Sequence, residues 1–539
     1  MEVPKLTLLW KYIDYWAEKK PDYPMIRFKK KVITAKEVKE NSDQLAKALL
    51  DMGVEKGDTI ATVIATTPEF IYSYIASSII GAIIVPMDKE YKTKDFESLI
   101  PHTGPKVIIT MKKWEKNKIA DNLMELKYQF GEIEYITIGE HELGVSLEEI
   151  MKNDYSNEEE LAKAKKNLDE EDCLMIIWTG GTTGAPKAVE LTNKNVIEMS
   201  ILEFEKINDD FKKVGYDIEE ENLKFLVNMP TSHVGGTIEL LTTGLIHGLE
   251  MIVQASWSPW DTLKAMQKYD IPFMGGVPTM FKILLSIPDL DNYHPKNHLK
   301  LVVLSGEKVS ADLLRDISDR ICENILIGYG STEAGAEVTF TDLEDEFAKI
   351  AEGYIGKPLP GISIKIIDSD GNELPAGEKG EIIVKGAVTS KSYYKMSEKT
   401  KNGFTNEEYC KTGDIGYMDE KGGVYISGRI KEIIRVGGYT VFPPEIESLS
   451  LEHPKIAIAA ALGAPDKIHG EVVWLVVGPE LGKKFTEEDK EELMESLRQN
   501  LAKFKVPKKI IVYPLDPNDL PITRLGKVDR KRLKKELIE

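Results

Sequence analysis

A glycine- and hydroxyl-rich segment that ends on a lysine gives the clearest chemical signal in this chain. Residues 174–187 read LMIIWTGGTTGAPK, so an apolar run opens into a loop that closes on Lys187. Glycine lets the backbone approach a ligand and adopt positive φ, and backbone N–H groups, threonine hydroxyls and a lysine ammonium all bind phosphate. The segment predicts a phosphate-binding loop. Taken alone, it could equally be a Gly/Thr turn after a buried strand.

The spacing excludes the P-loop of nucleoside triphosphatases. That loop has four residues between its glycines and a Ser or Thr after its lysine, whereas here three residues separate Gly180 from Gly184, and Ala188 follows Lys187. The segment instead resembles the phosphate loop of the AMP-forming acyl-CoA synthetases, the superfamily of firefly luciferase and the adenylation domains of peptide synthetases. Trp178, Gly180 and Ala188 depart from the commonest form of that loop, and Gly180 is the variant familiar from fatty-acid ligases.

Other blocks resemble the same family, in the same order. They are GYGSTEAG at 328–335, YCKTGDIGYMDEKGGVYISGRIKEIIRVGGYTVFPPEIE at 409–447 and LPITRLGKVDRKRL at 520–533. The similarity also includes GVEKGDTIATVI at 53–64 and GAIIVPM at 81–87, so it covers nearly the whole chain. The chain is identified as a member of this family, most similar to its medium- and long-chain fatty-acid–CoA ligases.

The resemblance implies activation of a carboxylic acid by ATP. The carboxylate oxygen attacks the α-phosphorus, pyrophosphate leaves, and the acyl-AMP passes its acyl group to the thiol of coenzyme A. Because the nucleophile is already ionised, the first step needs no general base; it needs two anions held together and the transition-state charge neutralised. The expected small molecules are a carboxylic acid, ATP, Mg²⁺ and coenzyme A.

Four residues are expected to be catalytic because they match family motif positions. Glu333 matches the magnesium ligand, and Thr332 matches a residue that bonds the α-phosphate. Lys187 ends the phosphate loop, and Lys527 matches a mobile lysine that bridges the substrate carboxylate and the α-phosphate. One carboxylate plus nucleotide phosphates is an adequate magnesium site. Read alone, Thr332 and Glu333 would indicate a helix start, and Lys527 a solvent-facing charge.

The resemblance also implies a nucleotide site. Tyr329 matches the aromatic residue that stacks on adenine, and Asp414 with Arg429 match the pair that bonds the ribose hydroxyls. The residues expected to bind ATP or AMP are Thr179, Gly180, Gly181, Thr182, Thr183, Gly184, Lys187, Gly306, Glu307, Tyr329, Gly330, Ser331, Thr332, Asp414, Arg429 and Lys527.

A hinge is implied at Lys431. In the family, the small C-terminal domain turns about this position after adenylation, which withdraws the lysine and brings another loop to the site. Here that loop contains Gly437, Gly438 and Tyr439 and is expected to line the tunnel for the pantetheine arm of coenzyme A. A few residues that absorb a large φ/ψ change are sufficient for such a movement.

The acyl pocket is expected to accept an apolar chain. The resemblance places small or apolar residues there, with no charged anchor for a second polar group, and acetate-specific relatives carry a blocking Trp where this chain has Gly330. An acid longer than propionate is expected, first a medium- or long-chain fatty acid; aryl and branched acids stay open. The expected pocket residues are His233, Val234, Gly235, Met274, Gly275, Gly306 and Gly330.

Three other functions are compatible with parts of the sequence. A ligase that loads a separate carrier protein would favour a basic docking patch on a chain this acidic. A non-catalytic relative is disfavoured by the intact Lys187, Glu333, Asp414, Arg429 and Lys527. An oxygenase like luciferase would use the same adenylate, so these motifs do not separate it from a ligase.

Composition indicates a large acidic enzyme. The chain has 539 residues, 42% of them hydrophobic, and a net charge of −19, which disfavours a nucleic-acid binder that relies on phosphate neutralisation. Its three cysteines are scattered, as in proteins of a reducing compartment, and no long unbroken apolar tract occurs. We expect a cytoplasmic protein without stable membrane insertion. Whether it forms a homodimer stays open.

The order of apolar runs predicts an α/β fold. Strand-like runs such as TIATVIA, LMIIW, LVVLS and ILIGY recur between amphipathic stretches, as expected for parallel sheets covered by helices. We expect a large adenylating domain over residues 1–430 with two such sheets. Within it, short strands and SDG, AGE and EKGG turns predict a β-rich subdomain at about 345–430. A small, mobile α+β domain is expected over 431–539.

Overall fold

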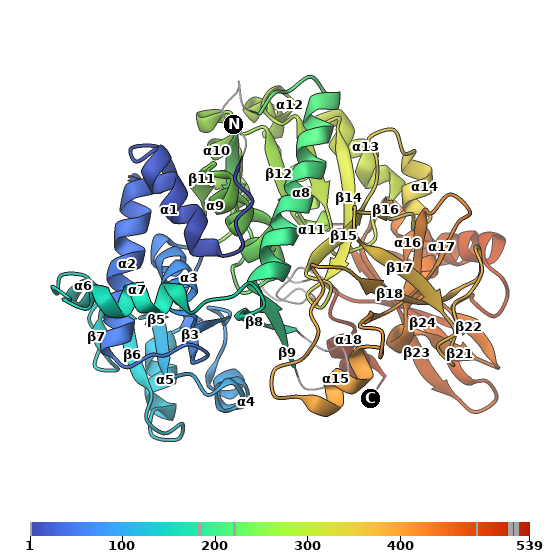
Figure 1. Ribbon diagram of the computed structural model, residues 1–539. Coiled ribbons are helices and arrows are strands. Elements are labelled where there is room, and N and C mark those ends of the chain that lie inside the picture. Colours follow the sequence, from blue (N-terminus) through green and yellow to red (C-terminus); the bar gives the residue numbers. More distant parts are fainter. Residues whose placement is uncertain are drawn as a thin grey trace.

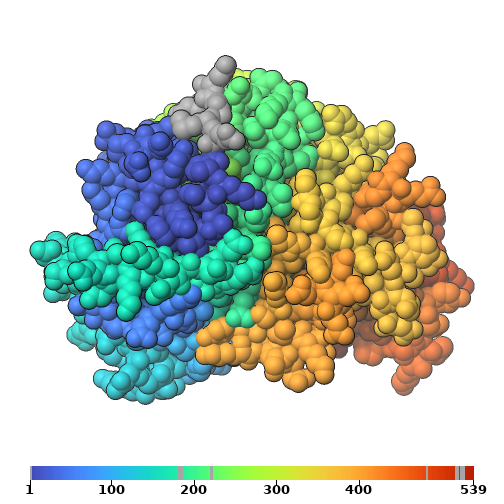
Figure 2. Space-filling model, in the orientation of Figure 1, coloured from blue at the N-terminus to red at the C-terminus, as the bar shows by residue number. Residues whose placement is uncertain are grey.

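The computed structural model describes residues 3–179, 186–218, 223–480, 483–515, 521 and 528–538. It is an α/β structure with two large sheets, a small four-stranded sheet and a separate C-terminal sheet (Figure 1). The space-filling view shows that residues from the first third of the chain, coloured blue to teal, occupy one side, and that the orange and red C-terminal segments occupy the other (Figure 2). The predicted fold class is confirmed.

The first large sheet carries the predicted phosphate loop at one edge. Its neighbouring strands are parallel except for the last pair, which forms an antiparallel hairpin. In spatial order the strands are β7 (Val145–Ser146), β6 (Glu134–Ile138), β5 (Val107–Met111), β3 (Thr59–Val63), β4 (Ile83–Pro86), β8 (Cys173–Thr179) and β9 (Lys187–Thr192).

The second large sheet is parallel in its centre and antiparallel at both ends. In spatial order its strands are β16 (Lys357–Pro358), β15 (Ala336–Phe340), β14 (Ile325–Ser331), β13 (Leu301–Leu304), β12 (Phe273–Gly276), β10 (Lys224–Val227), β11 (Glu250–Val253), β1 (Pro24–Phe28) and β2 (Lys31–Thr34). The predicted strands LVVLS and ILIGY are β13 and β14.

Alternate residues of these strands pack into different cores, so both sheets are covered on both faces. Ile60 and Phe225 belong to a central core, whereas their neighbours Ala61 and Leu226 belong to two outer cores. Fully buried parallel strands read as continuous apolar runs, which is why their positions were predictable. The layers therefore alternate helix, sheet, helix, sheet, helix.

The helices divide among these layers. The central layer contains α1 (Leu9–Lys19), α2 (Ala35–Asp51), α3 (Pro68–Ile80), α6 (Leu147–Ile150), α7 (Glu158–Lys166), α8 (Asn193–Lys213), the π-helix η1 (Gly235–Thr242) and α9 (Thr243–His247). The first sheet is covered outside by α4 (Thr93–Thr103) and α5 (Ile119–Leu126). The outer side of the second sheet carries α10 (Pro259–Tyr269), α11 (Pro278–Leu285), η2 (Leu290–Tyr293), α12 (Pro295–His298), α13 (Ala311–Arg320) and α14 (Phe347–Ala351).

The remaining elements form two smaller units at one end of the molecule (Figure 1). The four-stranded antiparallel sheet contains β17 (Ser363–Ile367), β18 (Gly380–Lys385), β19 (Cys410–Met418) and β20 (Val424–Arg429), with α15 (Ser397–Gly403) before β19. The C-terminal unit contains η3 (Ile430–Glu432), β21 (Ile434–Val436), β22 (Tyr439–Val441), α16 (Pro443–Leu451), β23 (Ile456–Asp466), β24 (Gly470–Pro479), α17 (Glu487–Asn500), β25 (Lys509–Val512) and α18 (Arg530–Leu537).

Candidate functional site

The β8–β9 hairpin positions the ends of the predicted phosphate loop. Thr179 ends β8 and Lys187 begins β9, and the two residues face each other in register. Trp178 and Ala188, the preceding and following residues, are buried in an outer core and fix the base of the hairpin. The predicted phosphate ligands Gly180, Gly181, Thr182, Thr183 and Gly184 lie outside the described residues.

Lys187 meets Glu333 at a tyrosine that the sequence did not indicate. Tyr393, from the loop before α15, accepts a hydrogen bond from Lys187 Nζ at 2.8 Å and donates one to Glu333 Oε1 at 2.9 Å. Lys187 Nζ lies 3.6 Å from the same carboxylate oxygen. The Lys187 and Glu333 side chains stay partly exposed, at 31% and 16%. The cluster thus offers one cation and one carboxylate beside the phosphate hairpin.

Burial under this cluster disfavours further negative charge. Burial raises the pKa of the Tyr393 hydroxyl, and the nearby Glu333 carboxylate raises it further. Cys410 is fully buried beneath, and burial followed by the charge of Glu333 raises the pKa of its thiol. Both groups are therefore neutral at physiological pH.

The predicted nucleoside residues form a second connected group. Tyr329 on β14 donates a hydrogen bond to Asp414 Oδ2 at 2.8 Å, and Arg429 Nε lies 3.0 Å from Asp414 Oδ1. Asp414 and Arg429 are register partners on β19 and β20, which explains their pairing although 15 positions separate them. Asp414 is buried, whereas Arg429 is 46% exposed, so the guanidinium is the accessible partner.

Thr332 and Glu333 lie in the turn 332–335 between β14 and β15, so the alternative interpretation of a helix start is wrong. The Ser331 hydroxyl accepts a hydrogen bond from the backbone N–H of Ala334 at 3.1 Å, and the Thr332 carbonyl accepts one from Gly335, also at 3.1 Å. The Ser390 N–H donates to the Glu333 carbonyl at 3.0 Å. These bonds fix the turn that carries the carboxylate.

The start of α18 faces the same region. Arg530 is bound to Glu447 at 2.5 Å. Burial lowers the pKa of its guanidinium, but the charges of Glu447, Glu432 and Glu307 outweigh burial and raise that pKa. Glu307 follows Gly306, which has a left-handed φ of 86° at the end of β13. Lys527, expected to be catalytic, lies outside the described residues and three positions before Arg530.

The predicted acyl-pocket residues do not all meet. A cavity of about 30 Å³ lies on the central-layer side of β12 and is lined by Gly275. A Cβ atom on Gly235 would lie 3.6 Å from Glu239 Oε2, and Glu239 lines the same cavity. His233 and Val234 are half-buried just before η1. Met274 points to the opposite face of β12 and is fully buried in the outer core.

The cavity beside β12 is acidic, whereas the sequence predicted an acyl pocket without a charged anchor. Glu203 from α8, Glu239 from η1 and Glu337 from β15 line the cavity, and their carboxyl oxygens lie within 4.8 Å of one another. Glu337 could have been noticed in the sequence, because it is a single acid in the buried strand AEVTF. A buried acid needs hydrogen-bond partners, a counter-charge or a retained proton. Glu203 and Glu239 gave no comparable local signal. Their meeting depends on how α8 and η1 pack.

These acids predict an unusual pH dependence of stability. Burial and the neighbouring carboxylates raise the pKa of Glu203 and Glu239, so the folded chain keeps protons that the unfolded chain releases. The contribution of these acids to stability is then greatest below the unfolded glutamate pKa of about 4.3. It falls as pH rises, by about 1.4 kcal/mol per pH unit for each retained proton. We expect Glu203→Gln to flatten this slope in urea unfolding between about pH 5 and pH 8. The exposed Glu205→Gln is the control, and equal slopes in all three proteins would contradict the prediction.

Gly330 is required by the backbone that it packs against. A Cβ atom at this position would lie 1.6 Å from the Ala336 carbonyl oxygen on the partner strand β15. We therefore expect Gly330→Ala to lower the free energy of unfolding by about 3 kcal/mol, measured in urea. At Gly275 the nearest atom would lie at 3.7 Å, so Gly275→Ala should leave stability within about 1 kcal/mol and serves as the control. Equal stability of the two variants would contradict this reasoning.

The predicted hinge and tunnel residues lie at the start of the C-terminal unit. Lys431 is exposed in η3. Gly437 and Gly438 form the turn between β21 and β22 with φ of 57° and 88°, and two consecutive positive φ values are typical of a tight hairpin. Tyr439 after them is 59% exposed and stacks on Phe504 with ring centroids 4.4 Å apart.

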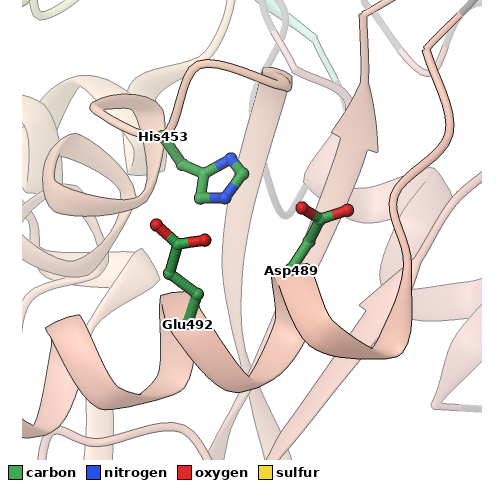
Figure 3. A group of neighbouring side chains, drawn as sticks. All are labelled: His453, Asp489 and Glu492. Carbon is green, nitrogen blue, oxygen red and sulfur yellow. The ribbon is translucent and has the colours of Figure 1, made fainter.

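A histidine and two acids also approach each other on the C-terminal unit. Figure 3 shows His453 facing Asp489 and Glu492 of α17, and their possible ligand atoms lie within 4.8 Å of one another. Asp489 is already engaged: Lys455 Nζ donates to it at 2.7 Å, and the N–H and hydroxyl of Thr486 donate to its other oxygen. This group is explained as a helix cap with an ion pair.

Two wider expectations can be compared with the described residues. Cys173, Cys322 and Cys410 are free thiols, as predicted. Within the described ranges, no helix combines the length and hydrophobicity needed to cross a membrane.

Comparison with known proteins agrees with this geometry. The family model for the AMP-binding enzyme matches residues 13–394, and the model for the AMP-binding enzyme C-terminal domain matches residues 445–527. The Long-chain-fatty-acid–CoA ligase of Bacillus subtilis (strain 168) is 30% identical over 544 residues, which cover 97% of this chain and 93% of the relative. The Oxalate–CoA ligase of Saccharomyces cerevisiae is 28% identical over 495 residues, which cover 89% of this chain and 86% of the relative.

Among solved structures, ATP-bound MatB from Rhodopseudomonas palustris is similar over 99% of both chains, with 26% identity and a TM-score of 0.82. Apo MatB covers the same share of both chains with a TM-score of 0.71. The overall arrangement described here is therefore more similar to the ATP-bound structure of that protein than to its apo structure.

Proposed function

Since this chain belongs to the family of AMP-binding enzymes and is an AMP-forming acyl-CoA synthetase, we propose that it activates an acid with an apolar chain as acyl-AMP and transfers the acyl group to coenzyme A. The observation that carries the proposal is the cluster of Lys187, Tyr393 and Glu333 at the base of the phosphate hairpin. A cation and a carboxylate beside this hairpin support the proposal that pyrophosphate leaves there with a metal ion bound to Glu333.

Each described residue of the site has a role in this proposal. Lys187 neutralises the departing pyrophosphate, and Tyr393 orients both Lys187 and Glu333. Asp414 accepts hydrogen bonds from the ribose hydroxyls, and Arg429 pairs with that carboxylate. Charge neutralisation in a partly buried site is the main catalytic effect, because both reactants are anions.

Glu333 fits the expected magnesium site. Its carboxylate is partly exposed and already accommodates a cation, the Lys187 ammonium at 3.6 Å. When bound, Mg²⁺ would supply charge neutralisation at the phosphates, and phosphate oxygens and water would complete its coordination.

The acid itself is a finer question. A medium- or long-chain fatty acid is supported by the apolar cavity walls Ile207, Leu240, Phe273, Val303 and Phe340 and by the activity named for the Bacillus subtilis relative. The activity named for the yeast relative concerns oxalate, a small dicarboxylate. Aryl or branched acids, and a carrier protein as acceptor, are alternatives.

The test is a product assay with the purified full chain. We expect acid-dependent conversion of ATP to AMP and pyrophosphate, and thioester formation only after coenzyme A is added. A graded series of straight-chain, branched and aryl acids identifies the preferred acyl group, and a phosphopantetheine-bearing carrier protein in place of coenzyme A tests the alternative acceptor. Release of ADP, or pyrophosphate release that does not depend on the acid, would contradict the proposal.

A further inference from the structure

The cavity beside β12 is mixed in character, with apolar walls and an acidic end. Leu240, Phe273 and Phe340 supply apolar surface, whereas Glu203, Glu239 and Glu337 supply three carboxyl groups. The lining comes from five elements, α8, η1, β12, β13 and β15, together with Ser305 just after β13. A pocket with apolar walls and a few converging polar groups is typical of a small-molecule site.

Few hydrogen-bond donors reach these carboxyl groups. Glu203 and Glu337 are only 3% and 7% exposed. Glu203 Oε1 accepts a hydrogen bond from the Glu337 backbone N–H at 3.3 Å. Glu337 Oε2 is buried with no hydrogen-bond partner among the described residues. An unsatisfied buried acceptor costs about 1–3 kcal/mol, and more if it is charged, so this end of the cavity is suited to a ligand that donates hydrogen bonds.

The acidic end adjoins the predicted adenylating site. Glu337 is the register partner of Gly330, which follows the proposed adenine-stacking residue Tyr329. Ser305 precedes Gly306, another predicted nucleotide residue. Two predicted acyl-pocket residues are also nearby: Gly235 is close to Glu239, and Gly275 lines the cavity. A ligand here would therefore occupy the acyl side of the proposed site.

The number and spacing of the three carboxyl groups indicate which kind of hydrogen-bond-donating group on a ligand would suit them. Three carboxyl groups within 4.8 Å cannot all ionise without a counter-charge, and protons are kept in the absence of a ligand. A primary ammonium supplies three donors and one positive charge in the volume of one small group. An unsubstituted alkyl chain would leave the same oxygens without donors.

We propose that the acyl group of the physiological acid ends in a primary amine, which Glu203, Glu239 and Glu337 bind while the apolar walls contact its hydrocarbon stem. This inference rests on the proposed function, because it assigns the cavity to the acyl chain of the acid that is adenylated. It also makes these three glutamates specificity-determining residues.

The test compares straight-chain acids of graded length with the same acids bearing a terminal amine. We expect the best amine-bearing acid to exceed its unsubstituted partner in kcat/KM for pyrophosphate release by at least about 100-fold, since an apolar end group leaves buried polar groups unpaired. Glu337→Gln keeps the size of the side chain and should reduce this ratio by about tenfold or more. Glu239→Gln is a second variant, and urea unfolding checks that each variant folds.

Glu205→Gln is the matched control, because Glu205 lies on the same helix as Glu203 but is exposed. It should leave the ratio of kcat/KM values unchanged. A wild-type preference for the unsubstituted acids, or an equal ratio in the wild type, Glu337→Gln and Glu239→Gln, would overturn the inference.

Calorimetry separates this inference from the proposed function. The amine-bearing acid should bind to the wild type without ATP and bind at least about tenfold more weakly to Glu337→Gln. If no acid of either series released pyrophosphate, the proposed function would fail, and this binding measurement alone would decide the inference; absence of saturable binding would overturn it. A saturable heat from MgCl₂ or MnCl₂ alone that is lost in Glu337→Gln would assign the cluster to a metal ion and also overturn it.

Discussion

Replacing Lys527 by alanine should reduce acyl-AMP formation by roughly 10²–10³-fold or more, while thioester formation from supplied acyl-AMP continues at nearly the wild-type rate. The first half-reaction brings a carboxylate to a phosphate, and it loses a neutralising ammonium in this variant. In the second half-reaction the thiol attacks the uncharged carbonyl carbon of acyl-AMP, so this step does not need the lysine to bring two anions together. Pyrophosphate release and thioester formation, measured separately, test the prediction.

The described neighbours of Lys527 support its assignment to the adenylating half-reaction. Val528 packs against the small core that contains Leu533. Arg530 is held by Glu447 at 2.5 Å and is close enough to Glu307, after β13, for that carboxylate to raise its pKa. The tail helix is thus anchored to the C-terminal unit beside a predicted nucleotide residue.

The exposed Lys531 gives a matched control on the same segment. Lys531→Ala removes one positive charge of the basic tail and should leave both half-reactions within about twofold of the wild type. Equal loss of both half-reactions in Lys527→Ala would show that the scheme of two domain orientations does not apply to this chain.

Replacing Glu333 by glutamine should reduce acyl-AMP formation by about 10²–10³-fold and raise the magnesium concentration needed for half-maximal rate. Glutamine keeps the shape of the side chain but removes the charge that attracts a metal ion and pairs with Lys187. The backbone hydrogen bonds of the turn 332–335 do not involve this side chain, so the fold should survive. Steady-state rates over a magnesium titration provide the measurement.

Tyr393→Phe separates the orientation of Glu333 from its charge. The variant removes the hydroxyl that donates to Glu333 and accepts from Lys187, and both charges remain. We expect a loss of about tenfold with little change in the magnesium requirement. A Glu333→Gln enzyme with a wild-type magnesium profile would remove Glu333 from the proposed metal site.

Local patterns were sufficient to predict the elements that are buried on both faces. The runs TIATVIA, LMIIW and ILIGY are β3, β8 and β14. Such strands are almost continuously apolar, so their hydrophobicity identifies them without knowledge of their partners. The pairing of Thr179 with Lys187 also joins residues that are close in the chain.

The tertiary structure alone decided which distant side chains meet. Tyr393 lies 206 positions from Lys187, and Glu203 lies 134 positions from Glu337, so no local spacing relates them. Their contacts depend on the order of strands in the sheet and on how helices cross it, which the hydrophobic pattern does not specify. For this reason the sequence correctly predicted an α/β adenylate-forming fold but did not indicate that the packing of α8, η1 and β15 brings three carboxyl groups together.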